Sequence, residues 1–195
     1  MPLWGNSDTD ESKPKWLTTE EKKEVFANET GWVVEGGSTM TGNDNPNAQP
    51  EILVAIRNLS NRMSEGTITE VEWISAGFDK SDGGTLSVRV RYNEPVTVTG
   101  SPTLSVTNGN QGTGSGRGPH TLVYASGTNT NELVFNLAIG PNNAATNAND
   151  QLTIGAQNIL KPGGATIKDK GTSVDSAVAI SGAIGTAAGA IIVTA

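Results

Sequence analysis

Few residues in this sequence could do chemistry, and none has the spacing that catalysis requires. His120 is the only histidine and cysteine is absent, which excludes disulfides, thiolate metal sites and sites that need two histidines. Nucleophilic catalysis needs a nucleophile, a base and an orienting group brought together, and no spacing here indicates that. Because His120 follows Gly118-Pro119, we expect it to be a loop residue and not a general base. We therefore expect no enzymatic activity.

Two further features resemble ligand sites only in part. Residues 112–118 (GTGSGRG) are glycine-rich, but they lack the Gly-Lys-Ser/Thr ending of a phosphate loop, so we interpret them as a hairpin tip. Asp79, Asp82, Asp150 and Asp169 lie in or near turns, where carboxylate oxygens could gather around Ca²⁺. Asx-turn hydrogen bonds explain these acids without an ion. We expect no cofactor, with Ca²⁺ as the alternative.

Composition and charge favour a mainly β protein that does not bind nucleic acid. The chain has 24 glycines and 35% hydrophobic residues, which suits short strands joined by tight turns. The net charge of −7 argues against nucleic acid, because phosphate binding needs clustered Lys and Arg. The N-terminus lacks the pattern of a secretory signal. Residues 177–195 are apolar but broken by glycines, which favours strands over a membrane span, so we expect no membrane contact.

The clearest pattern runs over residues 84–109. Apolar residues from Leu86 to Tyr92 alternate with polar ones, which is the two-residue period of a half-buried strand. Pro95 has no N–H, so we expect Glu94-Pro95 to interrupt this strand. Turn residues separate further strand candidates at 68–75, 85–92, 96–99, 103–107, 121–125, 132–139, 152–154, 165–167, 177–181 and 190–194. This spacing predicts a sandwich of two antiparallel sheets over residues 67–195.

Ahead of the sandwich we expect an extended arm and a small N-terminal region. The arm, residues 1–17, has few aliphatic residues and no periodicity, so it cannot fold alone. In residues 18–66, Thr18 precedes acidic residues and predicts a helix over residues 19–27, followed by short strands at 32–34 and 51–57. The expected fold class is therefore a β-sandwich preceded by an arm and a small α/β segment.

Large aromatic residues in these first segments are the candidate partner-binding residues. They are Trp4, Trp16, Phe26 and Trp32. Aromatic side chains often carry much of the energy at protein contacts. They could dock on a neighbouring protein or on the body of this chain, and both alternatives stay open.

Residues 88–104 (VRVRYNEPVTVTGSPTL) resemble the bacterial Ig-like repeat of cyanobacterial cell-surface proteins of the swimming-motility (SwmB) type. Residues 124–127 (YASG), 131–135 (NELVF) and 163–169 (GGATIKD) match in the same order. The family usually continues with Gly-Asn, where this sequence has Lys170-Gly171-Thr172. The resemblance covers about half of the chain and implies an Ig-like antiparallel β-sandwich on a cell or particle surface. It carries over no catalytic residue.

The first 16 residues (MPLWGN, then DTDESKPKW) resemble the opening of small virion structural proteins of T4-like marine cyanophages. The two resemblances together imply a phage virion structural protein, assembled in the host cytoplasm and located on the capsid surface. We expect a capsid decoration or cement protein that binds the major capsid protein or other virion proteins, and a second copy of itself as a further partner. The alternatives are a tail, neck or fibre component, and an adhesive module that binds host surface glycans.

Overall fold

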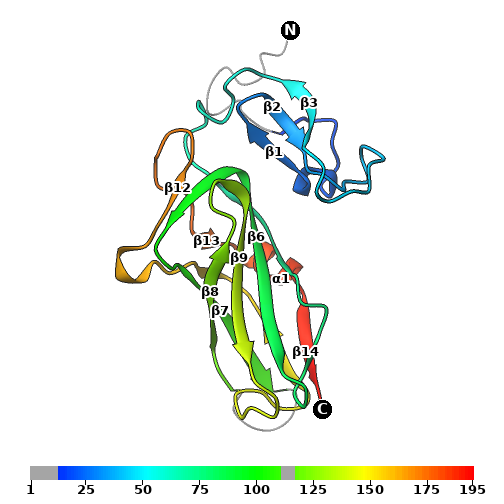
Figure 1. Cartoon of the computed structure of the whole chain (residues 1–195), viewed down its shortest axis with the longest axis vertical. Helices are drawn as coiled ribbons and strands as arrows, with labels where there is room; N and C mark the ends of the chain where they lie inside the picture. The colour runs from blue at the N-terminus through cyan, green and yellow to red at the C-terminus, as the bar shows by residue number, and fades with distance from the viewer. Residues whose placement is uncertain (1–12, 111–116) are drawn as a thin grey trace.

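The computed structural model describes residues 13–110 and 117–195 and is mainly β (Figure 1). We call residues 13–66 the N-terminal region and residues 67–195 the β body. The N-terminal region holds a three-stranded antiparallel sheet of order β1-β2-β3, formed by β1 (Val25–Asn28), β2 (Gly31–Val34) and β3 (Glu51–Ala55). One face of this sheet packs on a small core of Leu17, Val25, Ala27, Trp32, Val34, Leu59 and Met63.

The helix expected over residues 19–27 is wrong. A single 3₁₀ turn, η1 (Glu21–Lys23), stands there, and the chain then enters β1. The expected capping residue is in place, because the Thr18 N–H donates to Glu21 Oε2 at 2.7 Å and the Glu21 N–H donates to Thr18 Oγ1 at 3.2 Å. The turn does not continue because Val25, a β-branched residue, starts a hairpin with β2 and is buried there.

The β body is built on one large, curled sheet in which the strands follow the order β12-β6-β9-β8-β7-β10-β14-β5, with β4 also paired to β6. All of these pairs are antiparallel except β14 with β5. The strands are β4 (Ile68–Trp73), β5 (Phe78–Asp79), β6 (Gly84–Thr99), β7 (Thr103–Asn110), β8 (His120–Ser126), β9 (Thr130–Ile139), β10 (Asp150–Thr153), β12 (Thr166–Asp169) and β14 (Ala190–Thr194).

Four shorter elements complete the β body. The strands β11 (Gln157–Asn158) and β13 (Ala179–Ile180) pair with each other, and η2 (Pro162–Gly164) is a 3₁₀ turn. The helix α1 (Gly182–Ala187) lies between β13 and β14, where the sequence predicted strands alone. Ser181 Oγ caps it by accepting the Ile184 N–H at 3.3 Å. No helix in the described ranges is both long enough and apolar enough to cross a membrane.

β6 continues through Glu94-Pro95 to Thr99, so the expected interruption is an irregularity in the pairing and not a gap in the strand. The pairing of β6 with β9 shifts register between Arg91 and Val96. Beyond this shift, β6 pairs with β12. Pro95 lies within the irregularity, where its missing N–H costs no ladder hydrogen bond. The strand therefore continues past Pro95, and there β12 takes the place of β4 on the side of β6 opposite β9.

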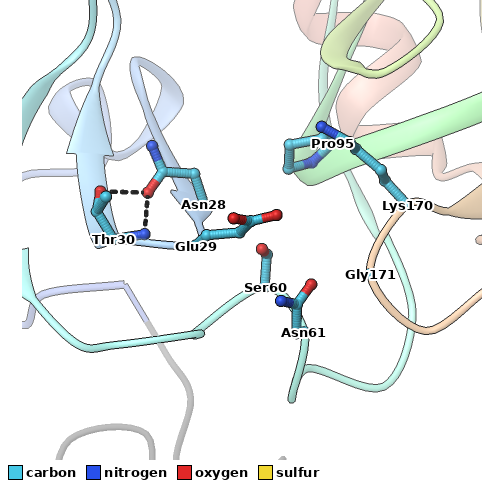
Figure 2. A pocket seen from close by; sticks show the side chains of 8 residues that line it. All are labelled: Asn28, Glu29, Thr30, Ser60, Asn61, Pro95, Lys170 and Gly171. Atoms are coloured by element: carbon cyan, nitrogen blue, oxygen red, sulfur yellow. Dashed lines mark hydrogen bonds between the residues drawn. The ribbon is translucent and has the colours of Figure 1, made fainter.

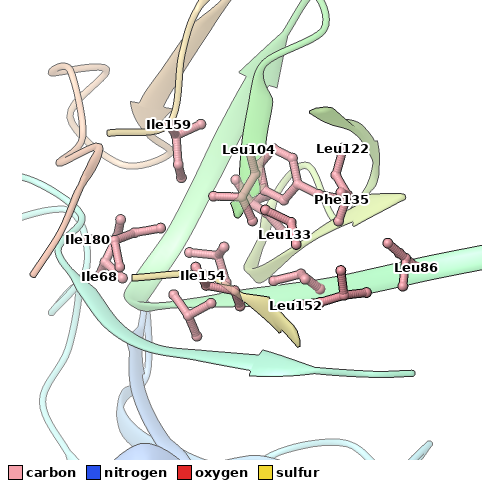
Figure 3. Close-up of a cluster of buried hydrophobic side chains, with 14 of the residues drawn as sticks. Ile68, Leu86, Leu104, Leu122, Leu133, Phe135, Leu152, Ile154, Ile159 and Ile180 are labelled. Carbon is pink, nitrogen blue, oxygen red and sulfur yellow. The ribbon is translucent and has the colours of Figure 1, made fainter. Parts of the chain in front are cut away.

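The interior of the β body is apolar (Figure 3). The alternation from Leu86 to Tyr92 predicts that the apolar side chains of β6 are buried, and this prediction is confirmed, but Arg91 between them is buried as well. Val88 pairs with Phe135 and Val90 with Leu133, so these residues are neighbours across adjacent strands. The side chains labelled in Figure 3 that line this core are Ile68, Leu86, Leu104, Leu122, Leu133, Phe135, Leu152, Ile154, Ile159 and Ile180.

Candidate functional site

The predicted anchor residues lie in different surroundings. Trp32 is 1% exposed in the small core, and Phe26 is 8% exposed. Trp16 is 62% exposed and directly precedes Leu17, which is buried in the small core. Trp4 lies outside the described residues. Of the predicted anchors in the described ranges, Trp16 therefore presents its side chain on the surface.

A cluster of charged side chains joins the N-terminal region to the β body. We call it the junction cluster, and it consists of Lys23, Glu35, Glu70, Glu72, Arg89, Arg91 and Glu132. The Arg91 side chain, only 10% exposed, is at its centre. Its guanidinium lies 2.9 Å from Glu35, 3.0 Å from Glu70, 2.8 Å from Glu132 and 3.4 Å from Glu72. Glu35 directly follows β2, so Arg91 holds the N-terminal region against the β body.

The strand register explains why opposite charges meet in this cluster. Because Val88 and Val90 turn into the core, Arg89 and Arg91 project from the other face of β6. Glu72 of β4 pairs with Arg89, and both Glu70 of β4 and Glu132 of β9 pair with Arg91. Opposite charges directly across strands stabilise the pairing.

Burial changes the acidity of two groups at this junction. Desolvation raises the pKa of Glu35 to about 7, against the opposing effect of Arg91, and the nearby Glu132 adds to the rise. Desolvation also lowers the pKa of Lys13 to about 8, although Glu70 opposes this. Removing one partner from such a cluster leaves a buried charge uncompensated. The arrangement therefore fits a structural junction that fixes two parts of the chain.

Two of the cavities near the junction are lined mainly by polar side chains. One, of about 440 Å³, lies between the loop around Pro46 and the side chains of Glu35, Arg91 and Glu132. The other, of about 340 Å³, is shown in Figure 2 and lies where the β1–β2 turn faces Pro95 and Lys170. Charged and hydrogen-bonding side chains line both cavities.

The cavity of Figure 2 is closed on one side by a tight approach between the two parts of the chain. A Cβ on Gly171 would lie 2.6 Å from the Ser60 carbonyl oxygen, so glycine is needed to bring this turn so close. On the opposite side, Asn28 Oδ1 accepts hydrogen bonds from the Thr30 N–H at 2.8 Å and the Thr30 hydroxyl at 2.5 Å. The Asn28 side chain therefore serves the β1–β2 turn, as in an Asx turn.

His120 is buried and begins β8, so the expectation that it lies in a loop is wrong. It pairs with Val106 across β7 and β8. Asn108 Nδ2 lies 3.0 Å from His120 Nε2 and 3.0 Å from Asp150 Oδ2, and Asp150 is fully buried. Burial lowers the pKa of His120, while Asp150 raises it. These contacts tie β7, β8 and the start of β10 together.

Two of the four acidic turn residues, Asp79 and Asp169, serve their own turns. Asp79 Oδ1 accepts hydrogen bonds from the Ser81 N–H at 2.8 Å and the Ser81 hydroxyl at 2.6 Å, and Asp169 Oδ1 accepts from the Thr172 hydroxyl at 2.6 Å. The Asp79–Ser81 contact is an Asx turn, as the sequence predicts, and Asp169 bonds to the hydroxyl three residues on. Among the described residues, no three His, Asp or Glu side chains are grouped so that they could hold a metal ion.

Three comparisons with known proteins gave no match. No family model matches this sequence. No curated protein matches it, and no solved structure matches its fold. We therefore argue the function from the residues and their geometry.

Proposed function

We propose that this chain is a non-enzymatic structural protein of a phage virion. In this proposal it is a capsid decoration or cement protein that binds the shell through its N-terminal region and displays an Ig-like β-sandwich on the capsid surface. The sequence resemblances of residues 1–16 and 88–104 support it. The observation that carries it is the exposed indole of Trp16, which lies at the base of the arm next to the buried Leu17.

The surroundings of Trp16 suit a contact residue. Its neighbour Leu17 is 6% exposed in the small core, so the backbone that presents the 62% exposed indole is held in place. A large amphipathic side chain on a fixed support loses little conformational entropy when it binds. Through the junction cluster, a partner bound at Trp16 also holds the β body.

The arrangement of the two parts supports display of the β body. The N-terminal sheet and β14 lie at opposite ends of the long axis (Figure 1). A shell bound at the N-terminal end would thus leave the far end of the β body projecting. The antiparallel pairing and the replacement of β4 by β12 beyond Pro95 are compatible with the Ig-like part of the proposal.

The aromatic residues of the β body favour the structural role over the glycan-binding alternative. Phe78, Tyr92 and Phe135 are buried, while Trp73 and Tyr124 are half-buried. Sugar rings bind by stacking on exposed aromatic faces, and this body offers few of them. A tail, neck or fibre position is distinguished by copy number and not by these side chains.

A binding assay on capsids that lack this chain tests the proposal. Full-length protein should bind, and deletion of residues 1–17 should abolish binding. Trp16→Ala should weaken binding by at least about tenfold, as truncation of an interface hot spot does. Ile192→Ala is the matched control, because Ile192 is also exposed but lies on β14 at the other end. Equal binding by the Trp16→Ala and control proteins would contradict the proposal.

Quantitative mass spectrometry of purified particles tests the position in the virion. A copy number on the order of hundreds, counted against the major capsid protein, supports decoration. A number of about six or twelve would instead indicate the neck or tail. Absence from particles would overturn the virion proposal and favour the host-surface adhesin.

A further inference from the structure

A groove runs along the outer edge of β4, between this strand and α1, and we call it the β4–α1 groove. It has a volume of about 440 Å³ and is lined by every residue of β4 from Thr69 to Trp73, by residues of α1 and by Lys23. Successive side chains of a strand point to opposite faces, so a cavity that touches such a run lies along the edge of the strand. In the described ranges β4 pairs with β6 alone, so this edge carries no other strand.

The backbone of β4 turns unused hydrogen-bonding groups towards this edge. The Ile74 N–H donates to the Ser87 carbonyl at 2.9 Å, and the register from there back to Glu70 is regular. Hydrogen-bonded pairs alternate with non-bonded pairs in an antiparallel ladder. The N–H and carbonyl groups of Val71 and Trp73 therefore point away from β6. Among the described residues, no backbone group outside the ladder bonds to them.

The walls of the groove are mostly apolar, and one polar atom in them has no partner. On the α1 side the groove is lined by Ala183, Ile184, Ala187 and Ala188. On the β4 side, Val71 and Trp73 pack against the core of the β body. The Trp73 Nε1–H is buried and has no hydrogen-bond partner in the described part of the chain. A buried donor without an acceptor is destabilising, so a backbone whose carbonyl groups enter the groove would supply what Trp73 lacks.

The described chain begins beside one end of the groove. Lys13 is the first described residue, and its Nζ donates to the Lys22 carbonyl at 2.5 Å. A smaller cavity of about 270 Å³ is lined by Lys13, Thr19, Lys22, Lys23 and Thr69. It shares Thr69 and Lys23 with the β4–α1 groove. The chain that precedes Lys13 therefore starts at the Thr69 end of the groove.

We propose that the first part of the arm, residues 1–12, lies in the β4–α1 groove of its own chain as an added strand, antiparallel to β4. These residues lie outside the described part of the chain. Because the arm must reach Lys13 near Thr69, an arm in the groove runs from Trp73 to Thr69, opposite to β4. Five residues of strand span about 17 Å and twelve extended residues reach about 40 Å, so the length is sufficient.

The sequence of residues 1–12 (MPLWGNSDTDES) fits the groove in this direction. Leu3 and Trp4 come first and would reach the apolar part between Trp73 and α1. The acidic residues come last, at positions 8, 10 and 11. They would lie near the smaller cavity, which Lys13 and the two lysines of η1 line. Opposite charges thus meet where the arm enters the groove.

The short connection to Lys13 is the reason for choosing the same chain as the occupant. In this proposal Trp4 binds the body of its own chain. Trp16 does not line the groove and is left for an outside partner. The inference therefore does not rest on the proposed virion function.

Residue-resolved hydrogen exchange of the full-length chain tests the proposal at the edge itself. The amides of Val71 and Trp73 should be protected, although β6 does not bond to them. Trp4→Ala should speed the exchange of both by at least about tenfold, while the Glu72 amide, which faces β6, should keep its rate. Trp16→Ala is the matched control, because it removes an indole that does not line the groove, and it should leave these rates unchanged.

A variant of α1 tests the same contact without changing the arm. Ala187→Glu places a charge in the apolar part of the groove and should speed the exchange of Val71 and Trp73 as Trp4→Ala does. Thr186→Glu is the control, since Thr186 is also exposed on α1 but does not line the groove. Circular dichroism checks that every variant is folded.

Cysteine pairs identify whose arm is bound, because the protein has no cysteine of its own. Asn6→Cys combined with Ala187→Cys should form a disulfide within one chain, which mass spectrometry of the digested monomer detects. Asn6→Cys combined with Ile192→Cys is the control, because Ile192 is exposed on β14 and does not line the groove. The control pair should oxidise much more slowly.

Three results would overturn the proposal. The first is exchange of the Val71 and Trp73 amides that is as fast in the wild type as in Trp4→Ala. The second is a disulfide between two chains, which would assign the groove to the arm of a second copy. The third is protection that appears only after capsids are added, which would assign the groove to a shell protein.

Discussion

The β body and the N-terminal region are both β-sheet structures, but they are stabilised by different means. The β body buries a continuous apolar interior that includes Leu122, Leu133 and Phe135. The N-terminal region has a much smaller core in which Trp32 is the largest side chain. It adds the junction cluster, where charged side chains of the β body surround Glu35. We infer that the N-terminal region depends on the β body for its stability, whereas the β body does not depend on the N-terminal region.

Substitutions in the two cores should cause the largest losses of stability. They test whether the dependence between the two parts runs in one direction only. Trp32→Ala and Phe135→Ala each remove a fully buried aromatic side chain and should each cost about 3–5 kcal/mol of local stability. Native-state hydrogen exchange measures which segments of the chain lose stability. Trp32→Ala should speed exchange in β1, β2 and β3 alone. Phe135→Ala should speed it in both parts, because an opened β body releases the junction cluster.

One result of this experiment would contradict the inferred difference between the two parts. If Trp32→Ala speeds exchange in β6 and β9 as much as in β1 and β2, the two parts unfold as one unit. The inference that the β body does not depend on the N-terminal region for its stability would then be wrong.

The next effect is that of the charge at the centre of the junction cluster. Arg91→Ala leaves the carboxylates of Glu35, Glu70 and Glu132 without their shared guanidinium and should destabilise the protein by about 3 kcal/mol. Arg62→Ala is the matched control, because Arg62 is exposed and its loss should change stability by less than about 0.5 kcal/mol. Urea denaturation measures both. Equal stability of the two variants would show that the junction is not held by Arg91.

Two adjacent residues at the base of the arm should differ in what they contribute to stability. Leu17→Ala removes a buried side chain of the small core and should cost about 2–3 kcal/mol. Trp16→Ala removes an exposed side chain and should change the free energy of unfolding by less than about 0.5 kcal/mol. Thermal denaturation of both variants checks this. A large loss for Trp16→Ala would place its indole in the fold and remove the observation that carries the proposed function.

The smallest effect is expected from pH, because two groups oppose each other. Glu35 has a pKa of about 7 against its ordinary 4.5, so the folded state binds the extra proton and stability falls as pH rises through that window. The pKa of His120 lies below its ordinary 6.5, so the unfolded state binds the extra proton and stability falls as pH drops below 6.5. Between pH 4.5 and 6.5 the two contributions partly cancel.

Single variants separate these contributions. Between pH 4.5 and 6.5, the stability of the Glu35→Gln variant should rise with pH. Over the same range, the stability of the His120→Gln variant should fall with pH. Urea denaturation at pH 5 and pH 6.5 measures the difference. If both variants show the same change of stability with pH as the wild type, the two pKa shifts do not govern that change.

The sequence predicts the β architecture because burial alternates with a period of two. The apolar side chains of β6 from Leu86 to Tyr92 follow this rule, and so do their partners on β9, although Arg91 is also buried. The helix over residues 19–27 was predicted wrongly because local capping competes with hairpin pairing. Thr18 signals a helix start, but Val25 gains more by pairing with β2, and that partner is not visible locally.

The junction cluster could not be predicted from local pattern, since Glu35, Glu70, Arg91 and Glu132 are far apart in the chain. One signal for it does exist in the sequence. Arg89 and Arg91 are two residues apart, and so are Glu70 and Glu72, so each pair projects from one face of its strand. Antiparallel pairing of the two strands then sets opposite charges against each other. The contribution of Glu35 depends on how the N-terminal region docks, which strand periodicity does not encode.

The length and direction of β6 have a mechanical consequence. This strand has 16 residues, and much of it runs along the long axis of the molecule before it bends towards β12 (Figure 1). It is paired with β4 and β9 on its two sides. Ladder hydrogen bonds lie across the strands, so tension between the two ends of the molecule loads many of them at once in shear. The protein should resist stretching along its length far better than peeling from the side, where hydrogen bonds break one after another.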